Sequence, residues 1–202
     1  IKTDVQDLDV DFLVFSAHKM CGPTGVGVLY GKKELLENVE PLLLGGGMNE
    51  SFDNEQAVYL KSLPTRLEAG TPNVAGVIGF GSAIEYLNKI GLDQIATYEK
   101  ELRRYLIDKL IAIPHLDIIN LESDSGIVSF NVNGVFSQDV AYYLNKYNIC
   151  VRAGNHCAKI LKKEVGVTNT LRVSLYFYNT FEEMDELVEL LSDKEKILKE
   201  ML

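Results

Sequence analysis

Cysteine is scarce in this chain of 202 residues, which contains only Cys21, Cys150 and Cys157. Three thiols cannot all pair with one another, and none of them stands in a Cys-x-x-Cys motif. This scarcity argues against a disulfide framework and against a structural zinc site. It favours reduced thiols in a cytosol-like compartment, so we expect a cytoplasmic protein without a metal.

Dense positive charge is also missing, because the formal net charge is −9 and the densest basic segment is the short run 159–163. A nucleic-acid-binding surface is therefore not expected. Long apolar runs are absent as well: residues 41–44 fall far short of the ~20 residues that a membrane helix needs. We expect neither a membrane span nor a signal peptide.

An apolar run follows the first residue closely. The chain begins at Ile1, and the near-continuous apolar run 11–16 follows almost at once. Such a run is typical of a strand buried on both faces of a parallel sheet, which needs neighbouring strands. We therefore expect the chain to be the C-terminal part of a longer protein.

The apolar pattern predicts an α/β protein with two parts that divide at about residue 91. In the first part we expect strands at 11–16 and 26–30, a short helix at 32–38, a long irregular stretch at 45–72 and a helix at 73–90. In the second part we expect strands at 116–120, 126–132, 149–152 and 171–176. A helix at 94–113 is expected to be capped by Asp93, and a second helix runs from Ser137, its expected cap, to Lys146. A capping box, Thr180 to Glu183, opens a last amphipathic helix.

Lys19 is the first candidate for chemistry. It lies where an apolar run ends in polar residues, just after Ser16 and His18 and before Gly22 and Gly25. A lysine amine held in a pocket at such a place can condense with an aldehyde, and Ser16 can donate to a phosphate. Taken alone, Lys19 is better explained as an exposed loop lysine, but together with Ser16, His18 and the glycines it favours a functional role.

Cys157 is the second candidate, because a glycine and two polar residues precede it and we expect it to be accessible. Cys150 stands between Ile149 and Val151 and fits the small buried cysteine that is the usual fate of a free thiol. No role is evident for Cys21. His156 beside Cys157 lacks further ligands at a spacing suitable for a metal.

Two arginines and one helix start complete the candidates. Arg172 in an apolar strand suits a bidentate clamp on a carboxylate, although a structural ion pair explains it as well, and Arg152 allows the same two interpretations.

The segment 68–73 precedes a helix. Backbone N–H groups and Thr71 can bind phosphate there, or the segment can serve as an ordinary helix cap. Gly79-Phe-Gly81 lies inside a helical pattern and lacks the spacing of a dinucleotide motif.

Four segments in order, 14–27, 66–73, 151–158 and 171–180, resemble the pyridoxal-phosphate-dependent cysteine desulfurases of the class V aminotransferase family. The short Arg152-Ala-Gly-Asn-His-Cys157 loop resembles the selenocysteine lyase-like branch, group II. The resemblance covers nearly the whole chain. It implies the fold type I of PLP-dependent transferases (aspartate aminotransferase-like), with residues 1–91 as the C-terminal part of the PLP-binding large domain and 92–202 as the small C-terminal α/β domain.

The resemblance also implies roles for the candidates. Lys19 would carry pyridoxal 5'-phosphate, Ser16 and His18 would hold its phosphate, and Thr71 would reach the phosphate of the partner subunit's cofactor in a homodimer. Arg172 would bind the carboxylate of L-cysteine, with Arg152 close by. Cys157 would be the nucleophile that takes the sulfur as a persulfide, leaves L-alanine, and passes the sulfur to an acceptor protein of iron–sulfur cluster assembly.

Two departures from the family matter. Asn155 stands where the family often has a histidine, and an amide cannot take part in proton transfer. The N-terminal half of the family, which supplies the ring-stacking histidine and the aspartate at the pyridine nitrogen, is not in this sequence. We therefore expect this chain alone to be inactive.

Other functions remain open from the sequence. A selenocysteine lyase would use the same residues. A kynureninase-like or epimerase-like enzyme of the same fold would not need Cys157. A non-catalytic module that docks iron–sulfur assembly proteins would need neither Cys157 nor Lys19.

Overall fold

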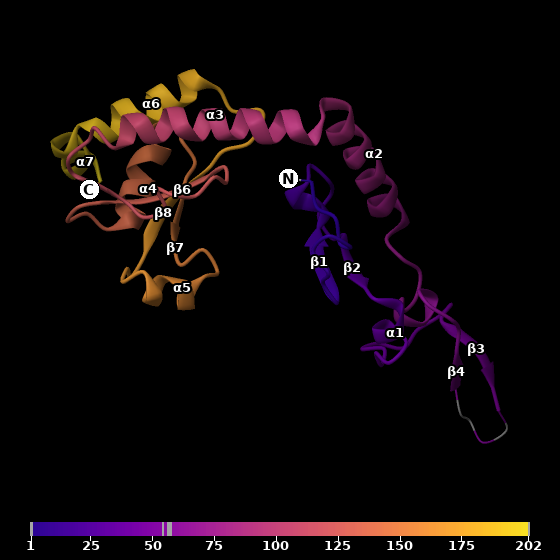
Figure 1. Ribbon diagram of the computed structural model, residues 1–202. Coiled ribbons are helices and arrows are strands. Elements are labelled where there is room, and N and C mark those ends of the chain that lie inside the picture. Colours follow the sequence, from indigo (N-terminus) through magenta and orange to yellow (C-terminus); the bar gives the residue numbers. More distant parts are fainter. Residues whose placement is uncertain (1, 54, 56–57, 202) are drawn as a thin grey trace. The chain divides into compact units, whose positions relative to one another are not determined.

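The computed structural model describes residues 2–53, 55 and 58–201 (Figure 1). It divides into two compact units, Ile1–Leu92 and Asp93–Leu202.

The first unit begins with an antiparallel hairpin. Strand β1 (Phe12–Ser16) pairs with β2 (Gly27–Gly31), and Ser16 lies opposite Gly27. The expectation of a strand buried on both faces in a parallel sheet is wrong for the described residues, because the pairing is antiparallel and Val14 is 73% exposed. In a hairpin covered on one face, the side chains that alternate toward the other face stay in solvent.

One face of this hairpin packs on a helix. Helix α2 (Val74–Ile90) begins at Asn73, whose Oδ1 accepts a hydrogen bond from Gly76 N, and it ends at Gly91 with φ 98°. Its Phe80 contacts Phe15 of β1, and a small core forms around Ala17, Phe80 and Ala83. The cap and the stop agree with the sequence pattern.

The segment 45–72 is more regular than expected. Strands β3 (Asn49–Phe52) and β4 (Val58–Leu60) form an antiparallel hairpin, and a 3-10 turn, η2 (Thr65–Leu67), follows. Helix α1 (Lys33–Leu36) is a single turn. The interpretation of 45–72 as irregular is wrong because two strands of four and three residues are too short to show a period-2 pattern.

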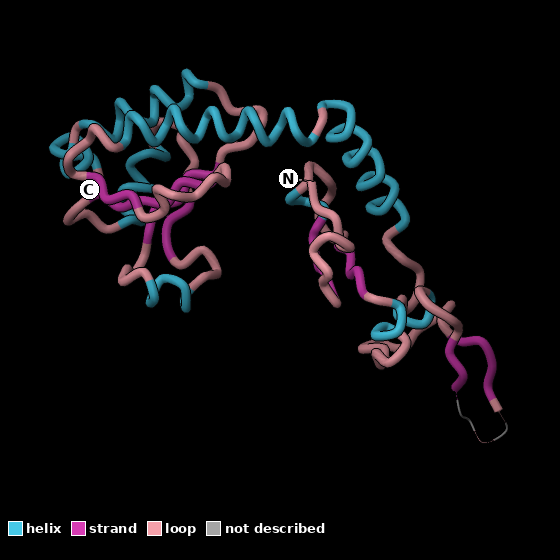
Figure 2. Tube along the Cα trace, in the orientation of Figure 1, coloured by secondary structure: helices cyan, strands magenta, loops and turns pink. Residues whose placement is uncertain are grey.

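The second unit is built on one antiparallel sheet with the strand order β5-β6-β8-β7. Its strands are β5 (Leu116–Ile118), β6 (Ile127–Val132), β7 (Arg152–Gly154) and β8 (Thr170–Ser174). In Figure 2 these strands form a continuous magenta group in the second unit. The expected strand at 149–152 instead begins at Arg152, so Ile149–Val151 lies before the sheet.

Helices cover the apolar face of this sheet. Val128 and Phe130 of β6 lie opposite Val173 and Leu171 of β8, and all four belong to one core. The helices that complete this core are α3 (Leu92–Leu110), α4 (Ser137–Asn145), α6 (Phe181–Ser192) and α7 (Lys194–Glu200). Tyr105 of α3 packs edge-on against Phe181 of α6, which holds these two helices side by side.

Two expected helix caps are wrong. Helix α4 has Phe136 as its N-cap, and the Ser137 hydroxyl donates to Asn169 Oδ1 instead. Asp93 lies within the first turn of α3, where its carboxylate faces the positive end of the helix dipole. In both cases the cap position differs by one or two residues, which is the usual uncertainty of helix ends.

The capping box of α6 is confirmed. Thr180 Oγ1 accepts from Glu183 N at 3.3 Å, and Thr180 N donates to Glu183 Oε2 at 3.0 Å. These bonds satisfy the backbone N–H groups of Thr180 and Glu183, which would otherwise lack partners at the helix start. They position the segment between β8 and α6.

Replacing Thr180 with Ala is therefore expected to lower the free energy of unfolding by about 1 kcal/mol, measured by urea denaturation. Thr97→Ala is the matched control, because the Thr97 hydroxyl donates to Asp93 O inside α3 and makes no cap. That change should be neutral or slightly stabilising. Equal losses in the two variants would contradict a capping role for Thr180.

Candidate functional site

The polar face of the four-stranded sheet carries the two candidate arginines. Arg172 of β8 lies opposite Arg152 of β7 on one side and opposite Ser129 of β6 on the other. Residues directly opposite in antiparallel strands share a face, and Leu171 and Val173 alternate into the core, so this row lies on the other face. Register thus brings together two residues that are 20 positions apart in sequence.

A tight loop at the end of β7 presents Cys157. Gly154, His156 and Cys157 have positive φ angles of 113°, 51° and 60°, and Ala158 N donates to Asn155 O at 2.8 Å. A non-glycine residue with positive φ is uncommon, and two in succession turn the chain back sharply. Cys157 is exposed, which confirms the expectation that it is accessible.

His156 fastens this loop to the sheet. Its Nε2 lies 2.7 Å from Thr170 Oγ1 and 3.0 Å from Thr170 O. Because a carbonyl oxygen only accepts hydrogen bonds, the contact with Thr170 O requires a proton on Nε2. Thr170 is 3% exposed at the start of β8, so the loop is attached to a rigid part of the unit.

The loop returns Cys157 to the start of the strand that precedes it. Arg152 Nη2 donates to Cys157 Sγ at 3.5 Å. No carboxylate in the described part of the chain forms an ion pair with Arg152 or Arg172, and Arg172 Nε is buried without a hydrogen-bond partner. Two arginines at paired strand positions, without an ion-pair partner among the described residues, are typical of a site that receives an anion.

In the first unit, Ser16, His18 and Lys19 lie together where the hairpin ends. Ser16 closes β1, and the turn η1 (Ala17–Lys19) follows directly. Ala17 is fully buried and its N donates to Val26 O, which fixes this turn on the hairpin. His18 and Lys19 are exposed, so the pocket expected around Lys19 is not formed by the described residues of this unit.

The segment that contains Thr71 approaches the same end of the hairpin. A Cβ atom on Gly25 would lie 3.8 Å from Asn73 Nδ2, and one on Gly76 would clash with Val26 of the hairpin turn. Asn73 is the helix cap, so the capping interpretation of 68–73 is correct for that residue. Thr71 itself is exposed two positions earlier and remains free to meet a ligand.

The other two cysteines are exposed as well. The expectation that Cys150 is buried is wrong, because Ile149–Val151 is not part of the sheet and borders a hollow of about 450 Å³ between β8 and the start of α6. Apolar neighbours in sequence thus do not predict burial of Cys150, because strand β7 begins only at Arg152. Cys157 does not line this hollow.

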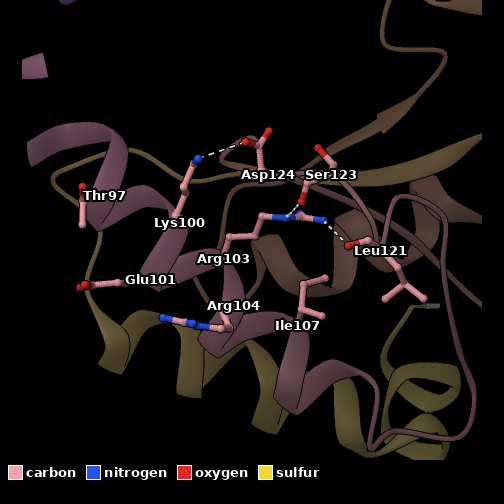
Figure 3. A pocket seen from close by; sticks show the side chains of 9 residues that line it. All are labelled: Thr97, Lys100, Glu101, Arg103, Arg104, Ile107, Leu121, Ser123 and Asp124. Carbon is pink, nitrogen blue, oxygen red and sulfur yellow. Dashed lines mark hydrogen bonds and ion pairs between the residues drawn. The ribbon is translucent and has the colours of Figure 1, made fainter. Parts of the chain in front are cut away.

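A hollow of about 470 Å³ beside α3 is lined by Arg103, whose role is structural (Figure 3). Arg103, 4% exposed, extends from α3 and donates to backbone oxygens of Ser123, Asn120 and Leu121, and to Ile127 O at 2.6 Å. Burial lowers the pKa of this guanidinium, and nearby Asp124 opposes the effect. Its donors are occupied by carbonyl groups, so Arg103 anchors the loop before β6 and is not available for a ligand.

Arg103→Met should therefore destabilise the protein by about 3 kcal/mol in urea denaturation, because several buried carbonyl groups lose their donor. Arg104→Met is the control, since Arg104 is exposed on the same helix, and its change should stay within about 0.5 kcal/mol. A loss of less than about 1 kcal/mol in Arg103→Met would contradict the anchoring role.

Sequence reasoning missed Thr170 and Arg103. Thr170 directly precedes the Leu171-Arg172 motif, but only the strand register shows that it meets His156. Arg103 stands in an amphipathic helix among charged neighbours, and its burial has no sequence signal except its position one residue after Leu102.

Two further findings concern the described residues alone. They contain no group of three or more His, Cys, Asp or Glu side chains arranged to hold a metal ion. None of their helices combines the length and the apolar character that crossing a bilayer requires.

Comparison with known proteins gives the family. The aminotransferase class-V family pattern matches residues 1–187. A probable cysteine desulfurase of Halalkalibacterium halodurans is 46% identical over 189 residues, which are 94% of this chain and 46% of the relative. A cysteine desulfurase of Haloferax volcanii is 42% identical over 92% of this chain and 44% of its own length. The chain thus spans about half the length of these relatives.

Solved structures agree. The cysteine desulfurase CsdA of Escherichia coli matches with a TM-score of 0.90 and 42% identity over 98% of this chain and 48% of its own. A cysteine desulfurase of Thermococcus onnurineus matches with a TM-score of 0.87 and 38% identity over 93% of this chain and 48% of its own. The expected fold of the PLP-dependent class V aminotransferases is confirmed. This chain belongs to the class V aminotransferase family.

Proposed function

We propose that the full-length protein carrying this chain is a cysteine desulfurase of group II, which converts L-cysteine to L-alanine and leaves the sulfur as a persulfide on Cys157. The observation that carries the proposal is the exposed thiol of Cys157 on a constrained loop, 3.5 Å from Arg152 and next to the row that contains Arg172. The relatives named cysteine desulfurase support it. The two units then correspond to the end of the large domain and to the small C-terminal domain.

The residues of the first unit suit pyridoxal 5'-phosphate as the cofactor. The amine of Lys19 has no ion-pair partner in the described part of the chain, and it can hold an aldehyde covalently. His18 on the same turn and Ser16 directly before it would offer donors to a phosphate, and Thr71 would serve the cofactor of the partner subunit in a homodimer. When bound, this cofactor supplies an electron sink for bonds at the substrate Cα.

The chain's own residues would then perform three tasks. Arg172 binds the carboxylate of L-cysteine, and the free Lys19 amine moves protons at the substrate Cα. The Cys157 sulfur forms a bond to the substrate sulfur while the substrate Cβ–S bond breaks and its electron pair stays with carbon. Protonation of that carbon gives alanine. The sulfur atoms are oxidised as the carbon is reduced, so no external oxidant is required.

The geometry of the loop also favours a dedicated acceptor. Since His156 is attached to Thr170 and two successive residues have positive φ, Cys157 has little freedom to carry a persulfide to a distant site. An acceptor protein of iron–sulfur cluster assembly would have to bring its own thiol to the loop. We place this reaction in the cytoplasm, where free thiols persist.

The experiment that tests the function uses the full-length protein loaded with pyridoxal phosphate. After exposure to L-cysteine, the peptide that contains Cys157 should gain the mass of one sulfur atom, and alanine should form. Alanine without a sulfur adduct would indicate a different lyase of this fold. If neither alanine nor the sulfur adduct forms, the result would favour a non-catalytic docking module. Parallel assays with selenocysteine would show which of the two substrates is preferred.

Arg172→Lys is expected to raise the KM for cysteine about tenfold with a smaller change in kcat, because a point charge cannot reproduce a bidentate fork. Steady-state alanine formation measures both constants. Arg104→Lys, an exposed arginine in the same unit, should leave both unchanged. An unchanged KM in Arg172→Lys would assign the carboxylate to another group.

A further inference from the structure

Arg152 stands at the reacting sulfur rather than at a carboxylate. Its single described hydrogen bond runs from Nη2 to Cys157 Sγ, and no acidic side chain in the described residues forms an ion pair with it. A guanidinium remains charged throughout the usual pH range. No ion pair among the described residues therefore neutralises its charge beside Cys157.

The position of Arg152 is unfavourable without an anion. Arg152 and Arg172 are direct cross-strand partners, and like charges in such a pair destabilise a sheet. A local conflict of this kind in an otherwise well-packed unit is typical of a functional site. Two cations in one row suit two anionic groups, and the substrate carboxylate accounts for only one of them.

We propose that Arg152 stabilises the anionic sulfur of Cys157, first as the thiolate that attacks and then as the persulfide that forms, and that it does not bind the substrate carboxylate. The part concerning the persulfide rests on the function proposed above. The loop supports this division, because the turn through His156 and Cys157 brings Sγ back to the strand position of Arg152, whereas Arg172 keeps its buried Nε for another acceptor. A thiolate is the nucleophilic form of cysteine, and a charged donor stabilises it.

The test measures how fast iodoacetamide alkylates each cysteine of the full-length protein without cysteine present, by mass analysis of the three peptides. Arg152→Gln should slow the alkylation of Cys157 about tenfold, as expected for loss of a charged donor. Cys21 and Cys150 are exposed thiols in the same molecule and should react as before. Arg152→Lys should recover most of the Cys157 rate, because the charge is restored.

Two controls keep the test decisive. Arg104→Gln removes the same charge from an exposed position in the second unit and should leave the Cys157 rate unchanged. If Arg152→Gln does not fold, the wild-type protein in low and high salt replaces it: screening should slow Cys157 selectively. An unchanged Cys157 rate in Arg152→Gln, or in high salt in that second case, overturns the proposal. Because the substrate is absent, this outcome leaves the desulfurase assay unaffected.

Discussion

Replacing Cys157 with Ser in the full-length protein is expected to reduce desulfuration of L-cysteine by about a thousandfold or more, as removal of a nucleophile does. Serine keeps the size of the side chain but lacks the soft, easily ionised sulfur that attacks another sulfur. Absorbance of bound pyridoxal phosphate should be retained, because Lys19 belongs to the first compact unit and is unchanged. Alanine formation measures the loss.

Cys150→Ser and Cys21→Ser are the matched controls. Both residues are exposed thiols like Cys157, but neither lies on the loop held by His156 and Thr170. These variants should keep desulfuration and its stimulation by an acceptor protein. A Cys157→Ser enzyme with wild-type turnover, or an equal loss in Cys150→Ser, would place the nucleophile elsewhere.

Replacing Lys19 with Ala should abolish stable attachment of pyridoxal phosphate and lower turnover by about a hundredfold or more. The amine is the one group of the Ser16–Lys19 turn that can hold an aldehyde covalently, and it also provides the proton transfers at the substrate Cα. Absorbance spectra of the purified protein test the first effect, and alanine formation tests the second.

Lys33→Ala is the control for this experiment. Lys33 is an exposed lysine of the same unit, at the start of α1, and its side chain has 81% of its surface in solvent. Its removal should change neither the spectrum nor the rate. If Lys19→Ala keeps the spectrum of a covalently held cofactor, another lysine carries it, and the assignment of the turn to the cofactor fails.

Local sequence was enough to locate the chemical groups. The apolar run 11–16 predicted the strand that ends just before Lys19, and a glycine followed by polar residues predicted the exposed Cys157. The capping box at Thr180 was predicted for the same reason: its groups lie within four residues of one another, so no distant part of the chain decides it.

Features that depend on pairing between distant segments were not predictable. Cys150 was expected inside a strand, but the edge strand β7 starts later, and only the hydrogen bonds to β8 decide where it starts. The burial of Arg103 has the same origin, whereas the hairpin of β3 and β4 was missed because its strands are too short to show a period-2 pattern. For Cys150 and Arg103 the deciding partner lies about 20 residues away in sequence, where periodicity carries no information.

The sequence by itself therefore singled out the chemical groups on which the proposed function rests: the amine of Lys19, the thiol of Cys157 and the cations Arg152 and Arg172. Only the tertiary structure decided how the last three are combined. A one-residue shift between β7 and β8 would move Arg152 to the opposite face, because side chains alternate along a strand. The observed register pairs the two arginine positions on one face, and the left-handed turn returns the sulfur to Arg152.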